Sequence, residues 1–279
     1  MPFFVGFDCL TYPGIDEMTW LKANTNLGWC GFYLAPAPSH SDSSWRGSRS
    51  DLVALGWGLL PIYVGQQTTG PGSHSVSGAQ GTLDGGDAAA LAAAAGFPNG
   101  AFLYLDIEDG SPLTDAAKAY VASWAVAVVA GNYLPGIYCS HLIARQVADL
   151  IGTLNPTPSA RIWAYKVTSV DPHPHEGDPR SFPSPDPSSS GFAGASVLQY
   201  EQNATVSLPS APITSLKMDL SSSSIQDPSA RGAAITAESW ISPSARPTIK
   251  KAKKKKPTGQ RQRKKGSPSR RSSTRRPVR

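Results

Sequence analysis

Strand-length apolar runs recur along the chain, and windows with helical spacing separate the first five of them. The early runs, such as FLYLD at 102–106, are apolar nearly throughout, which is typical of parallel strands covered on both faces. We expect strands at 2–8, 29–35, 59–65, 101–108, 134–140, 161–167, 195–202 and 213–220, and helices at 15–25, 48–55, 87–96, 114–131 and 141–151.

Eight strands within roughly 225 residues, with helices after the first five, favour a closed TIM-like β/α barrel. An open doubly wound sheet is the alternative. A Gly/Ser-rich loop is expected at 68–82 and a long Pro/Ser/Gly loop at 168–194. We therefore assign residues 1–225 to the barrel, 226–248 to a linker and 249–279 to a disordered basic tail.

The charge of the chain divides between these parts. Residues 250–279 hold 15 Lys and Arg and no acid, which leaves 11 basic against 20 acidic residues in 1–249. An acidic body therefore carries a polycation without aromatic residues, which suits phosphate-type contacts with an anionic polymer, whether cell wall, nucleic acid or lipid surface. A solubilising extension without a partner is the other interpretation.

Cys9, Cys30 and Cys139 are widely spaced and odd in number, so buried free thiols are expected in place of a disulfide framework. No run of apolar residues is long enough for a membrane helix. The first residues, MPFFVGFD, have no positive n-region or cleavage site, so we expect no secretory signal and a cytoplasmic location by default. Export by another route, or a trimmed mature form, stays open.

Polar residues follow the expected strands at their carboxyl ends. In a barrel these ends meet at one face, where catalytic residues collect. The residues are Asp8, Gln66, Gln67, Asp106, Glu108, Ser140, His141, Gln199, Gln202 and Asp219.

Asp106 and Glu108 are spaced i, i+2, so on a strand their side chains point to the same side. Two carboxyl groups in different environments can supply the two groups that glycoside hydrolysis needs: a general acid, and a second carboxylate that acts as a charge stabiliser or as a base. Glu108, nearer the rim, would hold a raised pKa, and the deeper Asp106 would stay charged. The alternative is that both acids cap helices or form ion pairs. Asp109-Gly110 is typical of a turn.

The chain resembles known families at these motifs. GFD in the first strand, D-x-E in the fourth, and QY followed by MDL in the last two resemble the family-25 glycoside hydrolases, which are bacterial and phage muramidases. GFYL, GWGLLPIYVGQQ, QGTLDGGDAA, GFP, YLDIE, PGIYCS and WAY are more similar to the glycoside-hydrolase-like domain of unknown function 1906, over about residues 4–222.

This resemblance implies a β/α barrel whose last three strands lack regular helices. It also implies that Glu108 is the proton donor, with Asp8, Asp106 and Asp219 as the other acidic positions of the site. Gln199 matches the glutamine of the QY pair. The sequence departs from the muramidases at Leu198, where they usually have Trp.

Aromatic residues near strand ends are candidates for stacking on a sugar ring, and packing in the barrel is the alternative for each. The substrate-binding candidates are Gln199, Tyr33, Tyr63, Gln66, Tyr138 and Trp163, and Trp45 is considered with them. We expect no cofactor and no metal. The HxH spacing of His173 and His175 could in principle bind a metal, but it lies in a Pro-rich segment typical of a solvated loop.

The sequence thus favours a monomeric glycoside hydrolase-like protein that cleaves or binds peptidoglycan or a related polysaccharide. The alternative is a catalytically inactive carbohydrate- or wall-binding module of the same fold. A nucleic-acid-associated protein, led by its tail, is the third possibility.

Overall fold

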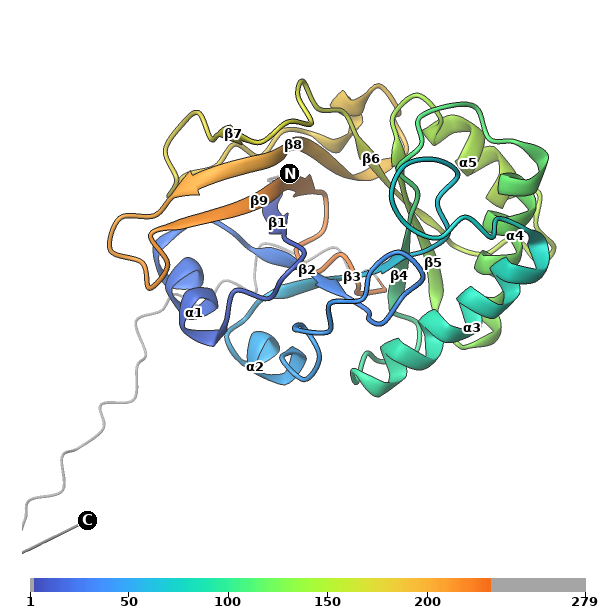
Figure 1. Cartoon of the computed structure of the whole chain (residues 1–279), viewed down its shortest axis with the longest axis horizontal. Coiled ribbons are helices and arrows are strands. Elements are labelled where there is room, and N and C mark those ends of the chain that lie inside the picture. The colour runs from blue at the N-terminus through green and yellow to red at the C-terminus, as the bar shows by residue number, and fades with distance from the viewer. Residues whose placement is uncertain (1–2, 232–279) are drawn as a thin grey trace, which may run out of the picture. The chain divides into compact units, whose positions relative to one another are not determined.

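The computed structural model describes residues 3–231, so the basic tail and most of the expected linker lie outside the described residues. Eight strands close into a barrel in the order β1–β2–β3–β4–β5–β6–β8–β9 (Figure 1). They are β1 (Phe4–Asp8), β2 (Trp29–Tyr33), β3 (Gly58–Val64), β4 (Phe102–Asp106), β5 (Leu134–Ser140), β6 (Arg161–Tyr165), β8 (Ala195–Ser207) and β9 (Ser215–Ser223). The expected barrel is confirmed, and the open sheet is excluded by the pairing of β6 with β8.

Helices follow the first five strands, as expected. They are α1 (Ile15–Asn24), α2 (Arg49–Ala54), α3 (Gly78–Ala94), α4 (Asp115–Ala130) and α5 (Ala144–Gly152). Between β6 and residue 231, the described chain contains only the two-residue strand β7 (His173–Pro174) and the 3₁₀ turn η1 (Pro187–Ser190) outside β8 and β9. The last three barrel strands therefore lack regular helices. No described helix is long and apolar enough to span a membrane.

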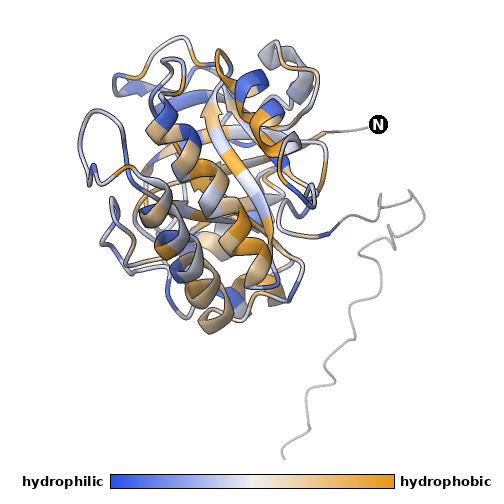
Figure 2. Ribbon diagram, turned by 90° about the vertical axis from the view of Figure 1, so that its right-hand side faces the viewer, coloured by the Kyte–Doolittle hydropathy of each residue, from blue (hydrophilic) through white to orange (hydrophobic). Residues whose placement is uncertain are grey.

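The apolar strands and one face of each helix form the core. Its largest fully buried side chains include Trp29, Trp45 and Trp124. Figure 2 shows hydrophobic and hydrophilic residues mixed along the helices on one side of the barrel, as expected for helices with one buried face. Cys30 and Cys139 are buried free thiols, and Cys9 is partly buried and free.

Helix α3 begins at Gly78, well before the expected start at residue 87 and inside the expected loop. Ser77 caps the helix by accepting a hydrogen bond from Gln80 N–H. Gly81, one of the glycines that suggested a loop, serves helix packing instead, because a Cβ on it would overlap the carbonyl oxygen of Tyr120 on α4. Composition alone cannot separate a glycine that permits close packing from one that makes a turn.

Strand β9 runs antiparallel to both of its neighbours, β1 and β8. Strand β8 also extends to Ser207, past its expected end at 202, and pairs with β9 along this extension.

Residues 227–229 close the amino-terminal end of the barrel. Tyr104 Oη and Arg161 Nη1 both donate to Pro228 O, at 2.9 and 2.7 Å, and Phe102 N–H donates to Ser229 O at 2.8 Å. The packed domain therefore reaches beyond the expected boundary at 225.

Candidate active site

A cavity of about 590 Å³ opens at the end of the barrel where the parallel strands finish. Its lining includes all four predicted acids, which come from separate elements: Asp8 from β1, Asp106 from β4, Glu108 from the segment after β4, and Asp219 from β9. Four of the six predicted substrate-binding residues also line it, namely Tyr33, Tyr138, Trp163 and Gln199.

Asp219 lies at the cavity for a different structural reason from the one expected. The sequence suggested the carboxyl end of a parallel strand, whereas Asp219 lies in the middle of antiparallel β9. The register of β9 places it opposite Asp8, the last residue of β1. Residues opposed in this way project from the same face of the sheet, so both carboxyl groups face the cavity.

The predicted polar residues form two hydrogen-bonded sets. Tyr33 Oη donates to Asp8 Oδ2 at 2.9 Å. In the second set, Tyr138 Oη donates to Gln199 Oε1, and Gln199 Nε2 donates to Asp219 Oδ2 at 2.7 Å. A carboxylate can only accept, so this chain fixes the orientation of the Gln199 amide.

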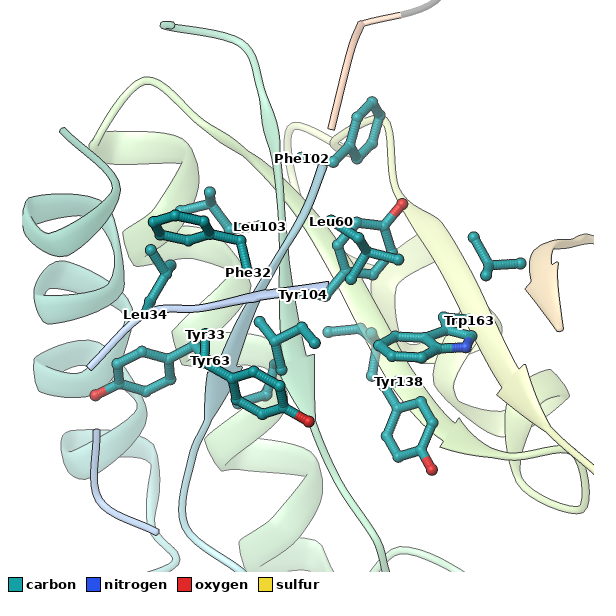
Figure 3. Close-up of a cluster of buried hydrophobic side chains, with 14 of the residues drawn as sticks. Phe32, Tyr33, Leu34, Leu60, Tyr63, Phe102, Leu103, Tyr104, Tyr138 and Trp163 are labelled. Atoms are coloured by element: carbon teal, nitrogen blue, oxygen red, sulfur yellow. The ribbon is translucent and has the colours of Figure 1, made fainter. Parts of the chain in front are cut away.

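Tyr63 and Gln66 lie outside the cavity lining. Tyr33 pairs with Ile62 across β2 and β3, so the next residue, Tyr63, faces the opposite side of the sheet. Its Oη donates to Asp87 of α3 at 3.0 Å, and Figure 3 shows the rings of Tyr33 and Tyr63 pointing in opposite directions. Gln66 Nε2 donates to Asp84 of α3 at 3.2 Å.

Trp45 is fully buried and donates from Nε1 to Cys9 O at 3.1 Å, so it belongs to the core.

The profile of the Rv2525c-like, glycoside hydrolase-like domain matches residues 19–211, well over half of the chain. The chain belongs to this family. Among curated proteins, none matches the sequence.

Several solved structures are similar to this Rv2525c-like domain. An uncharacterized B. stearothermophilus protein is 22% identical, with a TM-score of 0.52, over 78% of this chain and 94% of that one. The Clostridium perfringens spore cortex lytic enzyme SleM is 13% identical, with a TM-score of 0.50, over 79% of this chain and 67% of that one. A bacterial lysozyme from Streptomyces coelicolor is 12% identical, with a TM-score of 0.49, over 81% of this chain and 94% of that one. The first two similarities establish a shared fold.

Burial dominates the electrostatics of the site in this Rv2525c-like domain. It raises the pKa of Asp8 and Asp106 well above the usual carboxyl value, and the neighbouring acids raise both further. Asp106 was expected to stay charged, but it is buried, and the nearby Glu108 adds to the rise of its pKa. A proton is therefore held more firmly within the acidic cluster than the sequence indicated.

Burial also raises the pKa of Asp219, to about 6, while hydrogen bonds from Asn203 N–H and Gln199, together with the charge of Lys217, limit the rise. Glu108 is the most exposed of the four acids, and the partial burial of its carboxyl group raises its pKa as well.

Two fully buried carboxyl oxygens at the cavity have no hydrogen-bond partner within the described chain. They are Asp8 Oδ1 and Asp106 Oδ1, and both are buried. A buried carboxylate oxygen without a donor is costly, which agrees with the raised pKa of both carboxyl groups. Among residues 3–231, no group of three or more His, Cys, Asp or Glu has the arrangement needed to hold a metal ion.

The HxH segment of this Rv2525c-like domain contains the two-residue strand β7 (His173–Pro174), where a solvated loop was expected. His173 Nε2 and His175 Nδ1 contact the Glu201 carboxylate at 3.2 and 2.9 Å. The side chain of His175 is 4% exposed, so this segment is anchored to β8.

Several residues of the site were not among the predicted substrate-binding residues. They are Gln67, Gln202, Asn203 and Lys217, all of which line the cavity. Asn203 lies just past the expected end of its strand at residue 202, in the part by which β8 is longer than expected, and Lys217 lies within the expected last strand. The search for polar residues at the carboxyl ends of strands identified both Gln66 and Gln67, but it could not decide which amide faces the cavity.

Proposed function

We propose that this protein hydrolyses glycosidic bonds in peptidoglycan or a related polysaccharide. The observation that carries the proposal is the convergence of four acids on one cavity: Asp8 from β1, Asp106 and Glu108 from the end of β4 and the segment after it, and Asp219 from β9. Helix caps or surface ion pairs would not bring four acids together with almost no basic partner.

Glu108 is the proposed proton donor. Its raised pKa keeps the carboxyl group protonated to higher pH than an ordinary glutamate, as a general acid requires. The acid O–H would protonate the glycosidic oxygen while the bond from that oxygen to the anomeric carbon breaks. The bonding electrons pass to the leaving oxygen, water supplies the new hydroxyl group, and the proton that this water loses passes to a carboxylate of the site.

Whichever of Asp8, Asp106 and Asp219 is ionised would stabilise the positive charge that develops on the sugar ring, and a protonated member would orient the water. Tyr138 and Trp163 supply aromatic surface beside them, with ring centroids 4.5 Å apart. Aromatic rings that line a cavity can pack against the apolar faces of sugars, and here the Tyr138 hydroxyl is held by Gln199.

Turnover of dye-labelled cell walls tests the proposal. We expect wild-type protein to release label and Glu108→Gln to lose at least about 10²-fold in rate, the usual contribution of a general acid. The matched control is Asp109→Asn. Asp109 is the adjacent acid, lies outside the cavity lining, and accepts hydrogen bonds from Thr68 Oγ1 and Ser111 N–H.

Equal turnover by wild type and Glu108→Gln would contradict the assignment of the acid. Wall binding without turnover by wild type would favour the inactive binding module.

A further inference from the structure

Glu108 lies on a segment that no strand pairing holds. Strand β4 ends at Asp106, and residues 107–110 have no regular secondary structure. The last ladder-like bond runs from Ile107 N–H to Tyr138 O at 3.0 Å. A general acid needs a fixed position, so other groups must fix the backbone at Glu108.

The side chain of Gln67 fixes the backbone at Glu108. Its Nε2 donates to Asp106 O at 3.0 Å, and its Oε1 accepts from Glu108 N–H at 3.1 Å. The amide therefore spans Ile107 with one bond on each side. A backbone carbonyl can only accept and an N–H can only donate, so these two contacts set the orientation of the amide.

The position of Gln67 in the chain explains the geometry. Strand β3 ends at Val64, which pairs with Asp106 of β4. Gln67 follows shortly after, so its side-chain amide continues the pairing of β3 with β4 past the end of both strands. It occupies the place that a peptide group of a longer β3 would take.

Gln67 is itself held firmly. It is 2% exposed, and its N–H donates to Ser73 O at 2.8 Å. Its carbonyl oxygen lies 2.8 Å from His74 Nδ1. On the other side of the segment, Tyr165 Oη donates to Glu108 O at 2.6 Å. Glu108 is thus fixed between the ends of β3 and β6.

We infer that Gln67 is a positioning residue that sets the backbone of Glu108 at the cavity, and so the direction of its acid proton. This inference rests on the proposed function, in which Glu108 is the acid. Gln67 acts through Glu108 and does not take part in proton transfer.

Gln67→Met tests the inference, because methionine has a similar length and volume but cannot make either bond. We expect amide hydrogen exchange at Glu108 to become at least about tenfold faster, because its N–H loses its acceptor. We also expect kcat on labelled wall to fall on the order of 10²-fold with little change in KM, the scale of a misplaced catalytic group.

Asn26→Ala is the matched control. The Asn26 side-chain amide also makes two hydrogen bonds to the backbone. Its Nδ2 donates to Phe182 O at 2.8 Å, and its Oδ1 accepts from Phe182 N–H at 2.9 Å. It precedes β2, away from the carboxyl ends of the strands, and does not line the cavity. We expect unchanged exchange at Glu108 and unchanged kcat in this variant.

Gln67→Glu supplies a conditional rescue. A protonated carboxylic acid has one O–H donor and one carbonyl acceptor, so it can make both bonds of the amide. Once ionised it has only acceptors and loses the bond to Asp106 O. The kcat of this variant relative to wild type should therefore be close to one at low pH and fall as the pH rises.

The two measurements separate the inference from the function on which it rests. If wild type shows no turnover, the proposed function fails. Independently of turnover, unchanged amide exchange at Glu108 in Gln67→Met would show that the Gln67 side chain does not hold the backbone of Glu108. If wild type turns over wall, an unchanged kcat in Gln67→Met overturns the positioning role. A ratio of Gln67→Glu kcat to wild-type kcat that does not change with pH also overturns the positioning role.

Discussion

Asp8 and Asp219 stand directly opposite each other across the antiparallel strands β1 and β9. Two like charges in this arrangement destabilise a sheet by roughly 0.2–1 kcal/mol. Burial is the largest cause of the raised pKa of Asp8, and the negative charge of Asp219 is the next. The pair is therefore most stable when it holds a proton.

The direction in which folding stability depends on pH follows from these raised pKa values. Because folding raises the pKa of Asp219 from its ordinary 3.8 to about 6, its protonated form is favoured in the folded protein. The associated stability is fully present below pH 3.8 and is lost as the pH rises through about 6.

Asp8→Asn should remove the repulsion while its side-chain oxygen still accepts from Tyr33 Oη. At pH 8 we expect a gain of roughly 1 kcal/mol in the free energy of unfolding, which corresponds to a Tm higher by about 2–4 °C. At pH 4, where the pair already holds a proton, the gain should be absent. Thermal unfolding at both pH values measures the difference, and an equal shift at both would contradict the explanation.

Tyr138→Phe should loosen the hydrogen-bonded chain that ends on Asp219. Without the donor at Gln199 Oε1, the amide of Gln199 is free to rotate and its bond to Asp219 weakens. That bond lowers the pKa of Asp219, so we expect its pKa to rise above about 6. Carboxyl ¹³C NMR titration of Asp219 measures the shift.

Tyr133→Phe provides the control for this titration. Tyr133 Oη donates to Phe97 O at 3.1 Å and does not line the cavity. Its loss should leave the titration of Asp219 unchanged. A pKa of Asp219 that falls or stays constant in Tyr138→Phe would show that the chain does not act as described.

The sequence was sufficient for the barrel because apolar runs and their carboxyl-terminal acids report local properties of parallel strands. It placed Asp8 and Asp106 correctly for this reason. Asp219 was placed at the same face by an incorrect argument, because strand direction depends on a distant pairing that no local pattern records.

Side-chain direction was the harder problem. Tyr63 and Gln66 appeared equivalent to Tyr33 and Gln67 from their closeness to strand ends. Register separates Tyr33 from Tyr63, and loop conformation separates Gln67 from Gln66. Both are properties of the closed barrel, so the local sequence could not have distinguished the members of either pair.

Two glycines of α3 provide a matched test of the early start of this helix. A Cβ on Gly81 would overlap the Tyr120 carbonyl oxygen, whereas a Cβ on Gly86 would meet nothing within 4 Å. Gly81→Ala should lower the free energy of unfolding by about 1–3 kcal/mol through overpacking. Gly86→Ala should raise it by about 1 kcal/mol, the difference in helix propensity. Urea denaturation measures both, and a loop at 78–86 would remove the contrast.

We expect the basic tail to hold the protein on an anionic cell wall. Residues 1–249 hold 20 acidic and 11 basic residues, so this part alone would be repelled, while residues 250–279 supply 15 positive charges. We expect full-length protein to pellet with purified walls at low salt and to be released at about 1 M salt, where the Debye length falls to about 3 Å. Deletion of 246–279 should abolish the salt-sensitive binding, whereas binding to uncharged glycan particles should not change. Unaltered pelleting of the deletion variant at low salt would contradict an electrostatic role for the tail.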